Sequence, residues 1–196
     1  MIIKPDNEML SYSGRIDFDD RLAPVLVYAC SSIGMKFTGT SLKAVIANHR
    51  SCWTNELGYF IDGEQKRFTL SSDEEKKTYT LAEGLSEGTH ELLLFKRMDS
   101  CHTFTFYGFE IDDGAKVLPL PEKPKRKMEF FGDSVSCGEV SEAVEYVGKP
   151  DPEHDGEYSN SWYSYAWMTA RKLNAQIHDT SQGLSLIHIS EPTRLR

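Results

Sequence analysis

The pattern of apolar and polar residues over residues 1–114 is typical of short β-strands. Residues 103–106 read Thr-Phe-Thr-Phe, residues 42–47 form a β-rich run, and residues 91–95 form a short apolar run. Such runs are typical of half-buried strands, and no long helical period interrupts them. Several short strands at this spacing favour an all-β domain built as a two-sheet sandwich.

Turn residues separate these predicted strands. Residues 62–63 are Asp-Gly and stand between the candidate strands at 57–61 and 65–70. Glycine tolerates the positive φ that a primed hairpin turn demands, so we predict a β-hairpin here. The Gly-bearing segments at 84–88 and 112–114 are predicted turns that separate later strands in the same way.

A change of composition marks the end of the β-rich region. Residues 117–126 contain three prolines, which remove backbone donors and fix φ, so this segment cannot continue a central strand. We predict a Pro-rich interdomain linker over residues 115–126.

The pattern after the linker predicts a β-α-β unit over residues 127–183. We expect strands at 127–131 and 175–180 and a helix at 161–173, with Ser159 or Asn160 as its N-cap. The predicted buried face of this helix carries Trp162, Tyr165, Ala166, Thr169 and Leu173. Two strands joined through a helix predict an α/β domain with a parallel sheet.

The turn after the strand at 127–131 holds a candidate nucleophile. Gly132 favours a sharp turn, and Asp133 and Ser134 follow it. Ligands bind outside the carboxyl ends of the strands in an open parallel sheet, so an exposed Ser134 stands where chemistry is expected. Its own N–H is a candidate oxyanion donor. The competing interpretation is a local turn in which Asp133 and Ser134 bond to nearby backbone.

The composition is that of a globular chain and argues against two kinds of partner. Of 196 residues, 39% are hydrophobic and 27% charged, and the formal net charge is −8. Nucleic-acid binding needs clustered Lys and Arg, and the basic run at 123–127 reads as part of the solvated linker. No stretch approaches the roughly 20 apolar residues of a membrane span. We therefore expect no nucleic-acid partner and no membrane partner.

The N-terminus and the cysteines favour a reducing compartment. The first residues carry acidic side chains and lack the apolar stretch of a signal peptide. Cys30, Cys52, Cys101 and Cys137 form no Cys-x-x-Cys pair and have no His at zinc-ligand spacing. We interpret them as buried small side chains and expect a cytoplasmic protein.

The segment Gly-Asp-Ser-Val-Ser-Cys-Gly at 132–138 matches the nucleophile block of the SGNH (GDSL-like) hydrolases. The chain as a whole resembles the two-domain carbohydrate esterases of family 2, in which a jelly-roll β-sandwich precedes an SGNH catalytic domain. Segments of the sandwich that carry the resemblance are 36–41, 60–63, 84–90, 94–97 and 106–109. Residues 164–166 and 170–173 are similar to the first helix of the catalytic domain.

The resemblance implies a metal-free and cofactor-free deacetylation of a plant-cell-wall polysaccharide or oligosaccharide, such as acetylated xylan or mannan. Ser134 would attack the ester carbonyl and form an acetyl-enzyme, with a histidine as general base and acid. The oxyanion would be held by the N–H of Ser134, a glycine N–H and an asparagine side chain. Gly183 lies about where that glycine occurs in the family.

The match to the family stops after Gly183. Residues 184–194 are the codon-by-codon translation of a transposase sequencing-adapter DNA, so we interpret residues 184–196 as an artefact rather than a natural amphipathic segment. The asparagine and Asp/His blocks of SGNH hydrolases are then missing, and residues 127–183 form a truncated hydrolase domain. We expect this chain to be inactive alone.

No histidine in the sequence takes the place of the missing base. His188 belongs to the tail, and the remaining histidines are interpreted as structural or solvent-exposed: His49, His90, His102, His154 and His178. Among these, His154 is the least implausible base because its loop follows the nucleophile turn. The alternative function is carbohydrate binding by the sandwich, with exposed aromatic residues such as Trp53 or Tyr59 stacking on sugars.

Overall fold

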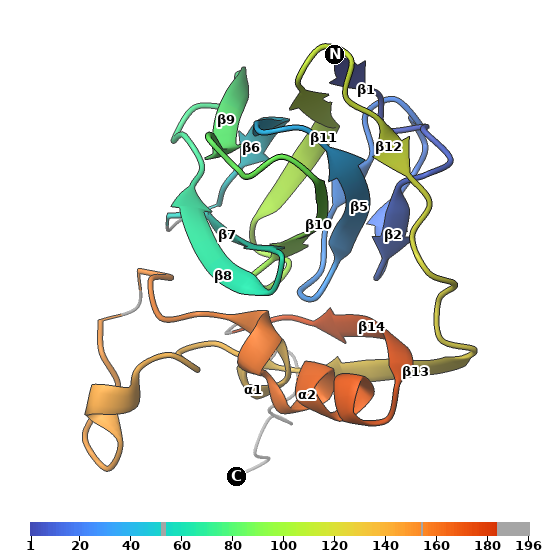
Figure 1. The fold of residues 1–196 in the computed structure, drawn as a ribbon. Coiled ribbons are helices and arrows are strands. Elements are labelled where there is room, and N and C mark those ends of the chain that lie inside the picture. Colours follow the sequence, from blue (N-terminus) through green and yellow to red (C-terminus); the bar gives the residue numbers. More distant parts are fainter. Residues whose placement is uncertain (52–53, 154, 184–196) are drawn as a thin grey trace, which may run out of the picture.

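The computed structural model describes residues 1–51, 54–153 and 155–183, and its larger part is a β-sandwich (Figure 1). One sheet has the strand order β3-β4-β11-β6-β9, with β1 also paired to β11, and the other has the order β12-β5-β10-β7-β8, with β2 also paired to β5. Their bounds are β1 Ile2–Ile3, β2 Ser11–Ser13, β3 Ile16–Asp17, β4 Val25–Leu26, β5 Ser32–Thr38, β6 Leu42–His49, β7 Glu56–Ile61, β8 Glu64–Thr69, β9 Lys76–Ala82, β10 Thr89–Lys96, β11 Thr103–Ile111 and β12 Val117–Leu118. The predicted two-sheet sandwich is confirmed.

The sandwich core forms because alternate strand residues point between the sheets. Phe104, Phe106 and Phe109 of β11 are fully buried in it, together with Phe37 of β5 and Ile46 of β6. The predicted hairpin is also confirmed. Asp62 and Gly63 both have positive φ, at 52° and 86°, as a type I′ turn requires, and they join β7 to β8.

The segment predicted as a linker is shorter than expected. Val117 pairs with Phe37 and Leu118 with Lys36, so β12 belongs to the edge of the sandwich. The first proline of the segment is Pro119, and the two residues before it keep their backbone donors and can pair. At its other end, the next strand already begins at Arg126.

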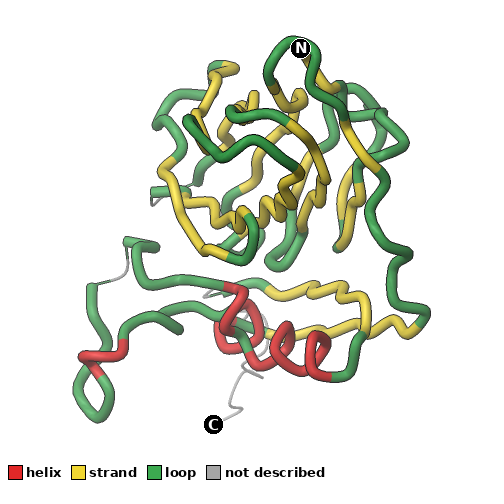
Figure 2. Tube along the Cα trace, viewed as in Figure 1, coloured by secondary structure: helices red, strands yellow, loops and turns green. Residues whose placement is uncertain are grey.

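The chain then forms a smaller unit, which we call the β13–β14 unit (residues 126–183). Its two strands, β13 (Arg126–Gly132) and β14 (Ala175–Ser181), pair in parallel, as predicted. Figure 2 shows its helical segments in red below the sandwich: α1 (Ser134–Cys137), η1 (Val144–Tyr146), η2 (Ser161–Tyr163) and α2 (Tyr165–Lys172). No helix among the described residues is long and apolar enough to cross a membrane.

The helix predicted at 161–173 is divided into η2 and α2. Asn160 caps η2 by accepting from the Trp162 N–H, and Ser164 caps α2 by accepting from the Trp167 N–H. Ser164 itself has extended backbone angles, so the helical phase is reset there. The predicted buried face is therefore wrong in part. Of its members Ala166 is buried, but Tyr165 and Leu173 are exposed, and the structure buries Trp167 and Ala170 instead.

A second hydrophobic core joins the sandwich to the β13–β14 unit. Ala29, Cys30 and Phe95 come from the sandwich, while Cys137, Ala166, Trp167, Ala170 and Ile177 come from the unit. The Phe95 ring meets Trp167 edge to face, with centroids 5.3 Å apart. The two parts are thus packed together through apolar side chains as well as joined by the chain.

The cysteines agree with the prediction in part. Cys30 and Cys137 are buried in this second core, whereas Cys101 is half-buried. Cys52 lies outside the described residues.

Candidate active site

The candidate nucleophile follows directly on the end of β13. Gly132 ends the strand, Asp133 is the N-cap of α1, and Ser134 is its first residue. The Asp133 carboxylate accepts from the Val135 N–H at 3.1 Å. The local-turn interpretation therefore holds for Asp133, whose side chain shapes the turn.

Gly132 is needed here for space. The chain turns directly after Gly132 from β13 into α1, and the φ of Gly132 is not positive. A Cβ at this position would lie 2.0 Å from the Ser136 Oγ and 2.7 Å from the Ser136 Cβ. The Ser136 hydroxyl shares a hydrogen bond of 3.0 Å with the Tyr165 hydroxyl, which ties the turn to α2. Gly132 thus allows α1 to pack closely on the strand that precedes it.

Ser134 lines a pocket of about 550 Å³ at the carboxyl end of β13. The serine is half-buried rather than exposed. Among the described residues neither its hydroxyl nor its N–H has a hydrogen-bond partner. The pocket is also lined by Val135, Gly138, Glu139, Val140, Ser141, Asp151, Tyr163, Ser164, Tyr165 and Met168. The local-turn interpretation therefore does not extend to the Ser134 side chain, and Ser134 borders a cavity of a size suited to a small ligand.

Gly183, the predicted oxyanion glycine, does not line this pocket. Its N–H donates to the Asp99 carboxylate at 2.5 Å, and Asp99 belongs to the sandwich. A Cβ on Gly183 would lie 2.9 Å from both the Asp99 Oδ2 and the Glu139 Oε2, so the site has little room for a side chain. The oxyanion role of Gly183 stays a prediction. It requires the Gly183 N–H to leave the Asp99 carboxylate and donate to the oxyanion instead.

No described histidine lines the Ser134 pocket. His49 bonds to Thr105 at 2.8 Å, His90 to Asp62 at 2.6 Å, and His102 accepts from the Ser51 N–H at 3.1 Å. These are structural contacts within the sandwich, as predicted. His178 is exposed on β14, and His154 and His188 lie outside the described residues.

Buried ionisable groups lie between the Ser134 turn and the sandwich. Asp179 of β14 is fully buried, and burial raises the pKa of its carboxyl to about 6, although hydrogen bonds from Ser181 and Cys30 oppose the rise. Burial lowers the pKa of Lys96 to about 8, and its ammonium donates to the carbonyls of Met98 and Asp99. Burial also raises the pKa of the Cys137 thiol, and nearby carboxylates raise it further. Cys137 is therefore held as a neutral thiol next to α1.

The wall of the pocket was missed by reasoning from sequence. Residues 138–141 form one side of it. The Gly138 carbonyl accepts from the Asn160 N–H and the adjacent Glu142 N–H donates to the Tyr158 carbonyl, and no periodic pattern in the sequence predicts these loop contacts. The sequence did mark Asn160, as a predicted helix N-cap. No sequence pattern pointed to Arg97, which contacts this loop from the sandwich.

Comparison with known proteins identifies the family. The family model described as carbohydrate esterase 2 N-terminal matches residues 12–121, more than half of the chain. The chain belongs to carbohydrate esterase family 2. The resemblance inferred from its motifs is thereby confirmed.

Relatives in this family are longer than this chain. The cellulase/esterase CelE of Acetivibrio thermocellus is 34% identical over 171 residues, which cover 87% of this chain and 20% of CelE. An acetylxylan esterase/glucomannan deacetylase of Cellvibrio japonicus is 27% identical over 154 residues, covering 75% of this chain and 41% of that protein. The solved family two carbohydrate esterase from Clostridium thermocellum in complex with cellohexaose superposes with a TM-score of 0.77 at 31% identity. That match covers 89% of this chain and 51% of the solved one, so the chain spans about half of its length.

Proposed function

We propose that the whole protein is a serine esterase that removes O-acetyl groups from plant-cell-wall polysaccharides or oligosaccharides through an acetyl-enzyme on Ser134. The observation that carries this proposal is the position of Ser134. Ser134 follows a parallel strand and lines a pocket, and its hydroxyl and N–H have no hydrogen-bond partner among the described residues. Relatives described as an acetylxylan esterase and as a cellulase/esterase support the substrate class.

In the proposed reaction the Ser134 Oγ attacks the acetyl carbonyl while a histidine accepts its proton. The negative oxygen is received by the Ser134 N–H, and in the complete site by a glycine N–H, for which Gly183 is the candidate, and an asparagine side chain. The sugar hydroxyl leaves with the proton from the histidine, and water then releases acetate and restores the serine. No metal or cofactor takes part in this scheme.

The pocket offers surface suited to a sugar ring. Tyr163, Tyr165 and Met168 line it, and all three side chains are partly open to solvent. Sugars combine apolar ring faces with hydroxyl groups, so aromatic side chains beside polar backbone are a suitable surface for them. We assign the β13–β14 unit to the beginning of an SGNH hydrolase domain on this basis and on its nucleophile block.

We further propose that residues 1–196 do not catalyse the reaction on their own. The described residues bring no histidine and no asparagine side chain into the Ser134 pocket. Without a base to take its proton, a serine hydroxyl is a weak nucleophile.

The test is acetate release from acetylated xylan and glucomannan. It compares the 196-residue chain with a longer protein that continues past Gly183, each as wild type and as Ser134→Ala. We expect acetate release only from the longer wild-type protein. Retained activity in its Ser134→Ala variant would contradict the nucleophile assignment, and Ser134-dependent release by the short chain would show that the base lies within it.

Carbohydrate binding by the sandwich alone receives no support from Tyr59. This residue is 6% exposed and donates its hydroxyl to the Leu81 carbonyl at 2.9 Å, so it belongs to the core instead of a sugar-binding platform. Trp53, the other candidate, lies outside the described residues.

A further inference from the structure

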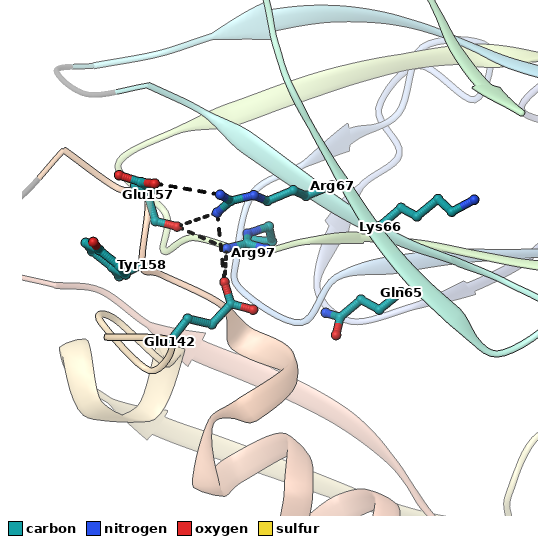
Figure 3. Close-up of a pocket in the computed structure, with 7 residues that line it drawn as sticks. All are labelled: Gln65, Lys66, Arg67, Arg97, Glu142, Glu157 and Tyr158. Atoms are coloured by element: carbon teal, nitrogen blue, oxygen red, sulfur yellow. Dashed lines mark hydrogen bonds and ion pairs between the residues drawn. The ribbon is translucent and has the colours of Figure 1, made fainter. Parts of the chain in front are cut away.

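Arg97 reaches from the sandwich into the loop that precedes α2. It follows β10 directly, and its side chain is almost fully buried. Its Nη2 donates to the Glu142 carboxylate at 2.7 Å and to the Glu157 carbonyl at 3.2 Å (Figure 3). Its Nε donates to the Ser159 carbonyl at 3.0 Å. A buried guanidinium is tolerated only when such partners satisfy it, so this contact is specific.

Glu142 and Asn160 continue the contact toward the Ser134 pocket. The second oxygen of Glu142 accepts from the Asn160 side-chain amide at 2.7 Å. The backbone of Asn160 bonds on both sides of the pocket wall: its N–H donates to the Gly138 carbonyl at 3.0 Å, and its carbonyl accepts from the Ser141 hydroxyl at 2.9 Å. Gly138 and Ser141 both line the pocket with Ser134. A continuous series of hydrogen bonds therefore leads from Arg97 to the pocket wall.

The wall held in this way contains a strained residue. Val140 has a φ of 49° and lies between the two wall residues that Asn160 fixes. A positive φ is unfavourable for a β-branched side chain, and it persists only where the surroundings impose it. The other described non-glycine residues with positive φ are Cys30, Asp62 and Asn174, none of which is β-branched.

We infer that Arg97 is a positioning residue, which sets the wall of the Ser134 pocket by holding residues 138–142 in this strained conformation through Glu142 and Asn160. The inference rests on the proposed function for its meaning in catalysis. It makes the sandwich a structural part of the esterase pocket: the sandwich supplies Arg97, which fixes the wall, while Ser134 comes from the β13–β14 unit.

Arg67 of β8 provides a matched control from the same cluster of charges. Its guanidinium donates to the Glu157 carbonyl at 3.0 Å and lies 3.3 Å from the Glu56 carboxylate, but 4.0 Å from that of Glu142. Its side chain is 44% exposed. Loss of its charge should therefore leave the wall in place, because exposed ion pairs contribute little.

The first experiment measures the backbone of the wall by NMR in the 196-residue chain. A left-handed residue brings its own amide and α hydrogens close together, so Val140 should give a strong intraresidue cross-peak in the wild type. We expect Arg97→Gln to weaken this peak and to shift the amide signals of residues 138–142, while Arg67→Gln leaves both unchanged. Glu142→Ala breaks the same contact from the loop side without removing a buried sandwich residue, and should reproduce the Arg97→Gln result.

The second experiment measures acetate release by the longer protein that continues past Gly183. Misplacement of the wall should raise KM and lower kcat/KM of Arg97→Gln by about tenfold to a hundredfold, with Arg67→Gln close to wild type. A Val140 signal that survives in both Arg97→Gln and Glu142→Ala would overturn the inference. An unchanged KM together with a lost Val140 signal would also overturn it, because the wall would then have no part in binding. Absence of Ser134-dependent release from the wild type would instead overturn the proposed function, leaving the NMR result to decide the structural contact.

Discussion

Asp179 should make the stability of the β13–β14 unit fall as pH rises toward neutrality. Burial raises its pKa from 3.8 to about 6, so between these values the folded chain keeps a proton that the unfolded chain has released. The contribution of Asp179 to the free energy of unfolding is then present below about pH 4 and is lost as pH rises through about 6. At about 1.4 kcal/mol for each pKa unit, the loss amounts to about 3 kcal/mol.

The variant Asp179→Asn isolates this contribution, because its side chain has nearly the same shape and does not titrate. Urea unfolding at a series of pH values, followed by tryptophan fluorescence, reports on the second core through Trp162 and Trp167. The difference in unfolding free energy between variant and wild type should move in favour of the variant by about 2–3 kcal/mol between pH 4 and 7. Hydrogen bonds lost from Ser181 or Cys30 add an offset, which does not alter this pH-dependent change.

A substitution that removes no titratable group at an exposed position, Leu22→Ala, serves as the control and should give a difference that does not vary with pH. Curves for wild type and Asp179→Asn that run parallel across the range would refute the reasoning. So would a wild-type stability that rises relative to the variant with pH.

Three other substitutions test separate parts of the structure. Gly132→Ala should destabilise the β13–β14 unit by about 1–3 kcal/mol in urea unfolding, because the added Cβ meets Ser136, and the double variant with Ser136→Gly should recover part of the loss. Phe95→Ala should cost about 3–5 kcal/mol and speed amide exchange across the β13–β14 unit, whereas Leu22→Ala at an exposed position should do neither. Ser134→Ala in the 196-residue chain should hydrolyse aryl acetates at the same rate as wild type; a slower variant would mean that Ser134 is already activated.

The sequence predicted the elements whose signals are local. The Asp62-Gly63 turn was predictable because the positive φ that it requires falls on two adjacent residues of types that tolerate it. The pairing of β13 with β14 followed from the β-α-β pattern. The buried face of α2 was predicted wrongly because the helical period was counted through Ser164, where a second cap restarts the helix.

In the candidate site, too, the features with local signals were predictable and the long-range contacts were not. Ser134 and its turn could be placed from the nucleophile block, which lies within a few residues. The bond from the Gly183 N–H to Asp99 and the contact of Arg97 with Glu142 join residues 84 and 45 positions apart. Such long-range partners depend on how the sandwich and the β13–β14 unit pack, and nothing periodic in the sequence encodes that.

The most direct test of the central claim is to trap the acetyl-enzyme. The longer protein is mixed with acetylated xylan, quenched in acid within a turnover, digested, and examined by mass spectrometry. The account predicts one added acetyl group on the peptide that contains Ser134, absent in Ser134→Ala. An acetyl group found on another residue, or acetate release without any acetylated peptide in either protein, would contradict it.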